Sequence, residues 1–317
     1  MFNVAIIGAG QLGSRHLQGL KGSASPLSIT VVDNNESSLK VAKERYDSIA
    51  GIGDKNVVFT TELSQLPSEL DLVVVATSSK PRAVIVKALL EHSVVKNLIL
   101  EKVLFTKLLE YDEILSLLYE KNVKCWVNCP RRMFGSYQTI LANLSRSEHI
   151  KMEYKGCDWG LCCNAMHFID VFMYLTGEDS YEIDSSLIEP EIIESKRNGY
   201  IEMNGTLSIT TPHGHSLILS SSHNISNSAC VNIKNGNHNI VLDEIHGDLT
   251  IDGKVVKVNT PYQSQMTGLL ADMLFSTGFC PLTRYDVSAG YHRIFIKELL
   301  STYNKITNSE SDMLPIT

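Results

Sequence analysis

A glycine-rich turn near the start of the sequence limits the possible folds more than any other feature. Residues 2–8 form a short apolar run that is typical of a buried strand, and this run leads directly into the motif GAGQLG at residues 8–13. Residues 11–20 then show the periodicity of a helix. A strand, a G-x-G-x-x-G turn and a helix in this order are typical of a dinucleotide-binding Rossmann unit.

Strands and helices alternate over the first 125 residues. The predicted strands lie at 28–33, 56–60, 70–77 and 97–100, and the predicted helices at 36–46, 81–92 and 107–121. The run LDLVVVAT at 70–77 is apolar on both faces, as a central parallel strand must be. We therefore predict an α/β Rossmann domain, with a doubly wound parallel sheet, over residues 1–124.

The second part of the sequence has a different rhythm. A predicted helix at 164–175 is followed by strand-like runs at 200–211, 216–222, 229–234, 238–242, 249–251 and 254–258. Pro-His-Gly, Asn-Gly and Asp-Gly turns separate several of these runs and suit hairpins. With a last helix at 285–303, the pattern predicts an α+β domain over residues 125–317, built on a large open, mostly antiparallel sheet. A chain of 317 residues suits two domains better than one.

The glycines of the turn have distinct physical roles in such a unit. Gly8 permits the tight turn, Gly10 lets the backbone approach a pyrophosphate, and Gly13 lets the helix pack closely on the strand. The first helical amides, those of Gln11, Leu12 and Gly13, would then face the phosphates together with the positive end of the helix dipole.

Asp33 lies 20 residues after the last glycine, at the end of the second strand. This is the place expected for a carboxylate that binds the ribose hydroxyls. Asn34 and Asn35 follow it, and no arginine is present there to hold a 2′-phosphate. The sequence therefore favours NAD over NADP.

Two further strands bring polar residues to the carboxyl edge of the sheet, where doubly wound folds bind ligands. Thr77 ends the central strand; the loop after it either lines the nucleotide site or only starts a helix with Ser79 as cap. Residues 97–105 read NLILEKVLF, so Glu101 and Lys102 end the next strand beside the expected nicotinamide. A solvated ion pair is the alternative interpretation of these two residues.

These motifs resemble those of the Gfo/Idh/MocA family of dinucleotide-dependent sugar and cyclitol oxidoreductases. The matching features are the glycine turn, Asp33, Ala76-Thr77, Glu101-Lys102 and the segment GLCCNAMHFIDVFMYLTG at 160–177. The resemblance implies that Lys102 and His167 are catalytic, Lys102 polarising the reacting oxygen and His167 acting as general base. Thr77 and Glu101 are expected at the cofactor from their positions at the carboxyl edge of the sheet.

The sequence departs from the family pattern at two positions. Val103 replaces the proline that usually follows Glu-Lys, and Cys163 replaces an aspartate found four residues before the histidine. If His167 needs a carboxylate, Asp158 and Asp170 are candidates. Cys163 itself is interpreted as a small apolar filler rather than a nucleophile.

Possible substrate contacts are Asn164, Asp158 and Arg131, with Asn128 as a further candidate beside Arg131. Each has a plainer alternative, because an asparagine often caps a helix and an arginine is often surface charge. His213 and His215 lie in a predicted hairpin turn without a nearby carboxylate, and we expect them to be solvated polar surface. We predict no metal site.

Composition limits the partners and the compartment. A net charge of −7 without a basic run argues against nucleic acid, and no stretch approaches the ~20 apolar residues of a membrane span. Seven cysteines without a Cys-x-x-Cys pair suit reduced thiols in the cytoplasm. The family resemblance implies a sugar-like small-molecule substrate and a homodimer or homotetramer.

The preferred hypothesis is thus an NAD-dependent dehydrogenase that oxidises or reduces a secondary alcohol or ketone of a sugar, sugar derivative or cyclitol. Two alternatives remain open at this point. One is a redox-neutral glycosidase that uses bound NAD transiently, and the other is a non-catalytic NAD-binding regulator. The sequence does not identify the substrate or the physiological direction.

Overall fold

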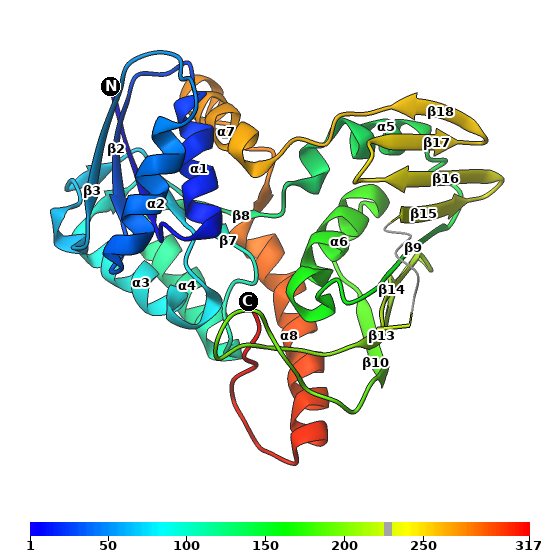
Figure 1. Cartoon of the computed structure of the whole chain (residues 1–317). Helices are drawn as coiled ribbons and strands as arrows, with labels where there is room; N and C mark the ends of the chain where they lie inside the picture. The colour runs from blue at the N-terminus through cyan, green and yellow to red at the C-terminus, as the bar shows by residue number, and fades with distance from the viewer. Residues whose placement is uncertain (225–229) are drawn as a thin grey trace. The chain divides into compact units, whose positions relative to one another are not determined.

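The structure, a computed structural model, describes residues 1–224 and 230–317 and contains two compact units (Figure 1). Unit 1 consists of Met1–Phe105, Leu109–Asn128 and Pro261–Tyr285. Unit 2 consists of Thr106–Leu108, Cys129–Thr260 and Asp286–Thr317. The sequence analysis placed a single boundary after residue 124, whereas the contacts also give unit 1 the returning segment Pro261–Tyr285.

Unit 1 is built on a seven-stranded sheet whose order is β19-β8-β7-β5-β1-β2-β3. Its strands are β1 (Phe2–Ile7), β2 (Leu27–Val32), β3 (Lys55–Thr60), β5 (Leu72–Val75), β7 (Asn97–Glu101), β8 (Lys124–Asn128) and β19 (Thr283–Arg284). All pairs are parallel except the edge pair of β19 with β8. The order reverses between β1 and β5, which is the switch point where doubly wound sheets bind ligands.

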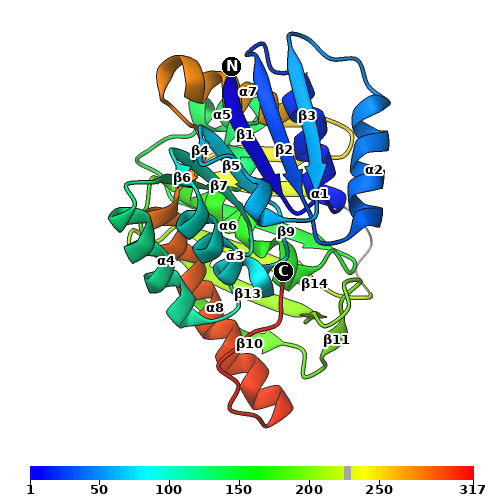
Figure 2. The same ribbon diagram turned by 90° about the vertical axis from the view of Figure 1, so that its left-hand side faces the viewer.

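The central strands are buried on both faces, as their continuous apolar sequence predicts. Every residue of β5 is fully buried, and Val4 to Ile6 of β1 are equally inaccessible. Helices cover both sides of this sheet: α1 (Gln11–Lys21), α2 (Glu36–Asp47) and α7 (Gln263–Thr277) on one side, α3 (Ser79–His92) and α4 (Leu108–Glu120) on the other (Figures 1 and 2). The prediction of a doubly wound parallel sheet is confirmed.

Some predicted bounds were wrong in detail. The strand predicted at 70–77 is divided, because β4 (Glu69–Leu70) pairs with β6 (Val94–Val95) in a separate small ladder and β5 starts two residues later. The residue in the N-cap position of α3 is Ser78 rather than the predicted Ser79. Helix α7 and strand β19 had no prediction at all.

Helix α7 packs on α1 through a contact between backbones. A Cβ atom added to Gly268 would lie 2.4 Å from the carbonyl oxygen of Gly19 and 2.8 Å from the amide nitrogen of Ser23. A Cβ on Gly19 would in turn meet the side chain of Thr267 at 2.9 Å. Only glycine fits at these two positions, so the pair fixes the distance between the two helices.

We therefore expect Gly268→Ala to destabilise the protein by about 1–3 kcal/mol, because backbone atoms cannot move aside for the added methyl group. Gly290→Ala is the matched control. Gly290 also lies within a helix, α8 (Tyr285–Thr307), but its added Cβ would meet nothing within 4 Å. The control should stabilise by about 0.5–1 kcal/mol. Chemical denaturation measures the change in the free energy of unfolding for both variants. Equal changes would contradict the packing argument.

Unit 2 is built on an eight-stranded sheet with the order β10-β13-β14-β9-β15-β16-β17-β18. The strands are β9 (Ile150–Gly156), β10 (Glu182–Ile188), β13 (Gly205–Thr210), β14 (Ser216–Ser221), β15 (Cys230–Asn235), β16 (His238–Asp243), β17 (Asp248–Ile251) and β18 (Lys254–Lys257). Only the pair of β14 with β9 is parallel among these ladders of the described chain. The predicted large, mostly antiparallel sheet is confirmed. Residue 229 of the predicted strand 229–234 lies outside the described residues.

One face of this sheet is covered and the other is open. In β15 the side chains of Val231, Ile233 and Asn235 are buried, while those of Asn232 and Lys234 are exposed. Helix α6 (Leu161–Thr176) packs against β14, and Tyr181 next to β10 donates from its hydroxyl to the backbone of α8 (Figure 1). Strands β9 and β10 and helix α5 (Gly135–Asn143) were missed by the sequence analysis.

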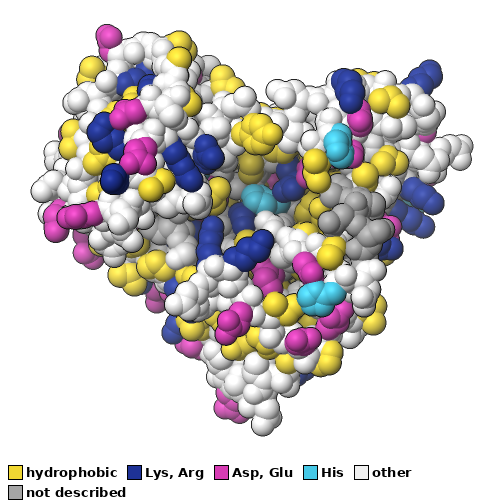
Figure 3. All heavy atoms as spheres, viewed as in Figure 1, with side chains coloured by type: hydrophobic (Ala, Val, Ile, Leu, Met, Phe, Trp, Pro, Cys, Tyr) yellow, Lys and Arg dark blue, Asp and Glu magenta, His cyan; other side chains and the backbone are white. Residues whose placement is uncertain are grey.

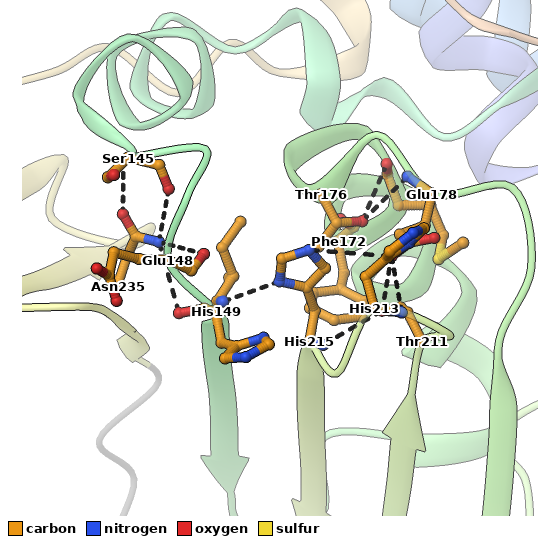
Figure 4. Close-up of polar contacts among 12 residues, drawn as sticks. Ser145, Glu148, His149, Phe172, Thr176, Glu178, Thr211, His213, His215 and Asn235 are labelled. Carbon is orange, nitrogen blue, oxygen red and sulfur yellow. Dashed lines mark hydrogen bonds and ion pairs between the residues drawn. The ribbon is translucent and has the colours of Figure 1, made fainter.

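A buried carboxylate holds the turn between β13 and β14 (Figure 4). Glu178 accepts hydrogen bonds from the Thr211 hydroxyl at 3.0 Å and from Nδ1 of His213 at 2.8 Å, and Nδ1 of His215 accepts from the amide of Ile150. The expectation that no carboxylate lies near these histidines was wrong. Glu178 lies next to them in the fold, although it is 33 residues distant from Thr211 in the sequence. His213 is solvent-exposed as expected, whereas burial of His215 lowers its pKa.

Candidate functional site

The glycine turn has the geometry that its sequence implies. Gly8 has φ of +93°, a conformation that side chains disfavour, and its added Cβ would lie 2.9 Å from the amide nitrogen of Thr77. A Cβ on Gly13 would lie 1.7 Å from the carbonyl oxygen of Gly8, so α1 packs directly on the turn. At Gly10 the added Cβ would meet nothing within 4 Å. Open space at this one glycine is where a phosphate group would approach.

Asp33 anchors the turn from the neighbouring strand. Its Oδ2 accepts a hydrogen bond of 2.6 Å from the amide of Ala9, and its Oδ1 accepts one of 2.9 Å from the amide of Asn35. The side chain of Asn35 in turn caps α2 by accepting from the amides of Ser37 and Ser38. A carboxylate has about four acceptor positions, so Asp33 retains capacity for two ribose hydroxyls.

Thr77 lies just after β5 at the same edge. Its side-chain oxygen is buried and has no hydrogen-bond partner among the described residues. Its carbonyl oxygen accepts from the guanidinium of Arg82, which also donates to the carbonyl oxygens of Val103 and Leu104. Arg82 is 1% exposed. Its hydrogen bonds tie the loop after β5 to the loop that carries Lys102.

The loop after β7 contains the first departure from the family pattern. The peptide bond between Lys102 and Val103 is cis although Val103 is not a proline. Lys102 is 8% exposed, and Val103 is completely buried. Lys102 thus lies at the carboxyl end of β7, as the strand pattern predicts. It is buried at the edge of the core and is not part of a solvated loop.

Glu101 lies in a buried hydrogen-bond network. Its Oε1 is 2.8 Å from Nε2 of His16 and accepts a 2.6 Å hydrogen bond from the side-chain amide of Asn128. Burial acts to raise the pKa of Glu101, but the hydrogen bond and charge of His16, the hydrogen bond from Asn128 and the charge of Lys102 together lower it. Although Glu101 is only 2% exposed, its pKa is therefore lowered.

These residues fit a bound dinucleotide on three counts. The space at Gly10 is open, the Thr77 hydroxyl is buried without a partner among the described residues, and Asp33 keeps free acceptor positions. The backbone amides of Gln11, Leu12 and Gly13 in the first turn of α1 are the donors that such a helix leaves for an anion.

In unit 2, His167 lies in the second turn of α6 and is half-buried. The amino end of this helix is capped from a distance: Glu202 accepts from the amides of Cys162 at 2.9 Å and Cys163 at 3.1 Å. The thiol of Cys163 contacts the carbonyl oxygen of Thr317. A carboxylate is therefore present next to position 163, but Glu202 supplies it.

The loop before α6 holds two of the predicted substrate residues. Asp158 accepts from the Asn204 amide at 3.0 Å and pairs with Nδ1 of His223 at 2.7 Å. These contacts lower the pKa of Asp158, the bond from Asn204 contributing most. The side-chain amide of Asn164 donates to the carbonyl oxygen of Trp159 at 2.7 Å, which closes the loop locally.

Both arginines after β8 are engaged in bidentate ion pairs within unit 2. Arg131 binds Glu244 through two hydrogen bonds of 2.8 Å and lies 4.3 Å from the ring centroid of Phe168. Arg132 binds Asp170, whose side chain is completely buried. These contacts give Arg131 and Asp170 structural roles within unit 2.

The sequence pattern gave no site role to four residues: His16, Arg82, Glu202 and Gln263, which accepts a hydrogen bond from Asn128. His16 is 1% exposed and lies within the Glu101 network. An arginine in the apolar face of the predicted helix 81–92 was a usable signal for a buried function. Nothing in the local pattern marked Glu202 or Gln263.

Three further observations concern possible partners. Among residues 1–224 and 230–317, no helix is both long and apolar enough to cross a bilayer. No group of three or more His, Cys, Asp and Glu side chains in the described part of the chain is arranged to hold a metal ion. On the face drawn in Figure 3, acidic and basic side chains are interspersed.

Comparisons with known proteins agree with this fold. Three similar solved structures are a biliverdin reductase from Synechocystis sp. PCC 6803 in complex with biliverdin and NADP+, an oxidoreductase from Agrobacterium radiobacter in complex with NAD+, L-tartaric acid and magnesium, and a UDP-N-acetylglucosamine 3-dehydrogenase from Acidithiobacillus ferrooxidans. Their TM-scores are 0.70, 0.70 and 0.69, with identities of 15%, 13% and 15%. The matches cover 95%, 96% and 94% of this chain and 98%, 97% and 96% of theirs. At these identities the likeness shows the fold of both units.

The nucleotide site defines the class of protein first: unit 1 is a dinucleotide-binding Rossmann unit. Residues 2–129 match the model of the Gfo/Idh/MocA family, described as an oxidoreductase family with an NAD-binding Rossmann fold. The resemblance is thereby confirmed over these residues, which match an NAD-binding Rossmann fold. A comparison with curated protein sequences gives no match.

The open space at Gly10 leads to a direct prediction. Gly10→Val should weaken binding of NADH by at least about tenfold, because the added side chain fills the position that a phosphate needs. Its thermal unfolding should not change, because no described atom lies within 4 Å of the new Cβ. Fluorescence titration with NADH measures the binding. Gly13→Ala is the contrasting variant, and it should lower the unfolding temperature instead.

The contact between Asp158 and His223 leads to a second prediction, which concerns the titration of His223. The hydrogen bond and charge of Asp158 raise the pKa of His223. A raised histidine pKa adds stability that is present below the unfolded value and lost as pH rises through the folded value. Asp158→Asn should return the His223 titration to lower pH, as followed by NMR of its ring protons. Asp252→Asn, which removes the partner of His238, should leave His223 unchanged.

Proposed function

We propose that the protein is an NAD-dependent dehydrogenase acting on a secondary alcohol, or the corresponding ketone, of a sugar, sugar derivative or cyclitol. The match of residues 2–129 supports the redox class and the cofactor. One structural relative, the dehydrogenase of UDP-N-acetylglucosamine, acts on a sugar nucleotide. A cytoplasmic homo-oligomer that binds no nucleic acid and no membrane completes the proposal.

The observation that carries the proposal is the position of Lys102. It ends β7, which pairs with β5, and β5 pairs with β1, the strand that leads into the glycine turn. The carboxyl ends of parallel strands lie at one edge of the sheet, so Lys102 is at the edge that holds the glycine turn and Asp33. A lysine that is only 8% exposed at that edge is suited to stabilise negative charge on a reacting oxygen.

The proposed roles follow from the donors and acceptors that each residue offers. Asp33 would bind the ribose hydroxyls, and the amides of residues 11–13 would bind the pyrophosphate. Lys102 would donate a hydrogen bond to the substrate oxygen, and His167 would accept the hydroxyl proton from that oxygen as general base. When bound, NAD supplies the acceptor for the hydride. The proposal requires that Lys102 and His167 meet at one substrate oxygen.

The proposed substrate contacts in unit 2 follow from their position near His167. Asp158 and Asn164 lie in the loop before α6 and at its first turn, beside the helix that carries His167. Each keeps hydrogen-bonding capacity beyond its contacts within the loop. Arg131 is a weaker candidate, because Glu244 already occupies its guanidinium from two directions.

Lys102→Met tests the mechanism. We expect kcat/KM to fall by about 10²–10³-fold, which is typical for the loss of one group that stabilises charge in the transition state. NADH affinity should stay within about twofold, because the nucleotide is held by the glycine turn and Asp33. The assay follows NADH absorbance over a panel of sugars, sugar nucleotides and cyclitols. His167→Asn should likewise lower kcat, by about 10²–10⁴-fold.

Lys87→Met is the matched control, because Lys87 is an exposed lysine of the same unit whose ion pair with Glu113 lies at the surface. Its activity should be unchanged within about twofold. Survival of most activity in Lys102→Met would remove Lys102 from the mechanism. Products formed without net NADH would favour the redox-neutral glycosidase. Tight NAD binding without turnover on any substrate, biliverdin included, would favour the non-catalytic regulator.

A further inference from the structure

Three elements of unit 1 contribute side chains to the network around the carboxylate of Glu101. His16 comes from α1, Asn128 from the end of β8, and Gln263 with Thr267 from α7. The contacts form a continuous chain: Asn128 donates to Glu101 at 2.6 Å and to Gln263 at 2.9 Å. Glu101, His16, Asn128 and Thr267 are each at most 2% exposed.

The direction of the central hydrogen bond follows from the ionised form of Glu101, which its lowered pKa favours. An ionised carboxylate can only accept, so Nε2 of His16 carries the proton and donates to Glu101 across 2.8 Å. This holds whether the imidazole is neutral or charged. The other ring nitrogen, Nδ1, lies 2.9 Å from the hydroxyl of Thr267 and 3.4 Å from the side-chain amide of Gln263. The ring is therefore held on both sides and cannot turn away from Glu101.

The charges around Glu101 are few. The imidazole of His16, from α1, and the charge of Lys102, the next residue along the chain, both lower the pKa of Glu101. The side chains that join the network from β8 and α7 are Asn128, Gln263 and Thr267, and none of them titrates. A buried carboxylate with so little solvent depends on its donors to stay ionised.

We propose that His16 is a positioning residue for the reaction: by donating to Glu101 it keeps that carboxylate ionised and fixed, and Glu101 in turn holds the ammonium of Lys102. The proposal rests on the catalytic role of Lys102 given under the proposed function. It also assigns a purpose to the return of α7 to unit 1. That helix supplies the hydroxyl and the amide that orient the imidazole. His16 itself lies three to five residues after the amides of residues 11–13, which are expected to bind phosphate.

The first test needs neither substrate nor cofactor. In protein labelled with ¹³C at the glutamate carboxyl groups, the Glu101 signal is assigned by its loss in Glu101→Gln and followed against pH. In His16→Leu the carboxylate loses its imidazole donor while burial remains, so its titration should move up by about one pH unit or more. In His16→Gln the amide can still donate, and most of the shift should be absent.

A matched control carries the same chemical change elsewhere in unit 1. His92 is exposed at the end of α3 and contacts only the backbone oxygen of Leu66 among the hydrogen bonds described for it. His92→Leu should leave the Glu101 titration where it is in the unaltered protein. A Glu101 titration that is the same in His16→Leu as in the unaltered protein would overturn the proposal.

The second test uses turnover with whichever substrate the panel identifies. His16→Leu should lower kcat by about tenfold to a hundredfold and move the acid limb of its pH profile upward, because Glu101 must be ionised to hold Lys102. His16→Gln should restore most of kcat and the original profile. Thr267→Val, which removes the hydroxyl that orients the ring, should show a smaller change in the same direction.

These outcomes separate the positioning role from its alternatives. A purely structural role for His16 would lower the unfolding temperature and kcat without moving the acid limb, and it would overturn the proposal. A panel without any turnover, combined with the expected shift of the Glu101 titration, would overturn the proposed dehydrogenase while leaving the control of Glu101 by His16 established. An unshifted Glu101 titration in an enzyme that turns over substrate would overturn the role of His16 and leave the proposed dehydrogenase standing.

Discussion

The close approach of the α1 backbone to its neighbours is the constraint on which the rest of unit 1 depends. At its first turn the helix touches the carbonyl of Gly8 through Gly13, and at its end it touches α7 through Gly19 and Gly268. Any side chain at these points would push the helix away from the sheet. Because α1 is fixed at both ends, its free amides face the nucleotide site and its one histidine, His16, reaches the end of β7.

A buried charge connects the cofactor site with the proposed chemistry. Glu101 bonds to His16 of α1, the helix whose first amides are proposed to bind phosphate. It directly precedes Lys102, the lysine proposed to act at the reacting oxygen. In such a dry environment an ionised carboxylate is costly unless donors surround it, and His16 and Asn128 meet this requirement. The same low solvent exposure makes the contacts between these groups strong, which is why small changes in the donors are expected to alter titration rather than only stability.

Specific hydrogen bonds surround each of the two positions that depart from the family pattern. Around Val103, Arg82 donates to the carbonyl oxygens of the loop and ties it to Thr77. Around Cys163, Glu202 binds the first amides of α6, so a carboxylate stands at the start of that helix without being part of it. Negative charge at the amino end of a helix is favoured by the helix dipole, whichever segment supplies it.

Sequence alone determined the elements of the Rossmann unit, the glycine turn, Asp33 and the position of Lys102, because these follow from strand and helix periodicity and from spacing along a short stretch of chain. It also gave the open antiparallel sheet of unit 2, whose hairpin turns are local signals. Only the tertiary structure decided that α7 returns to unit 1, that Glu202 caps α6 and that His16 binds Glu101. Such contacts join side chains tens to hundreds of residues apart, and they are selected by packing geometry and by the need to satisfy buried polar groups, which leave no periodic trace in the sequence.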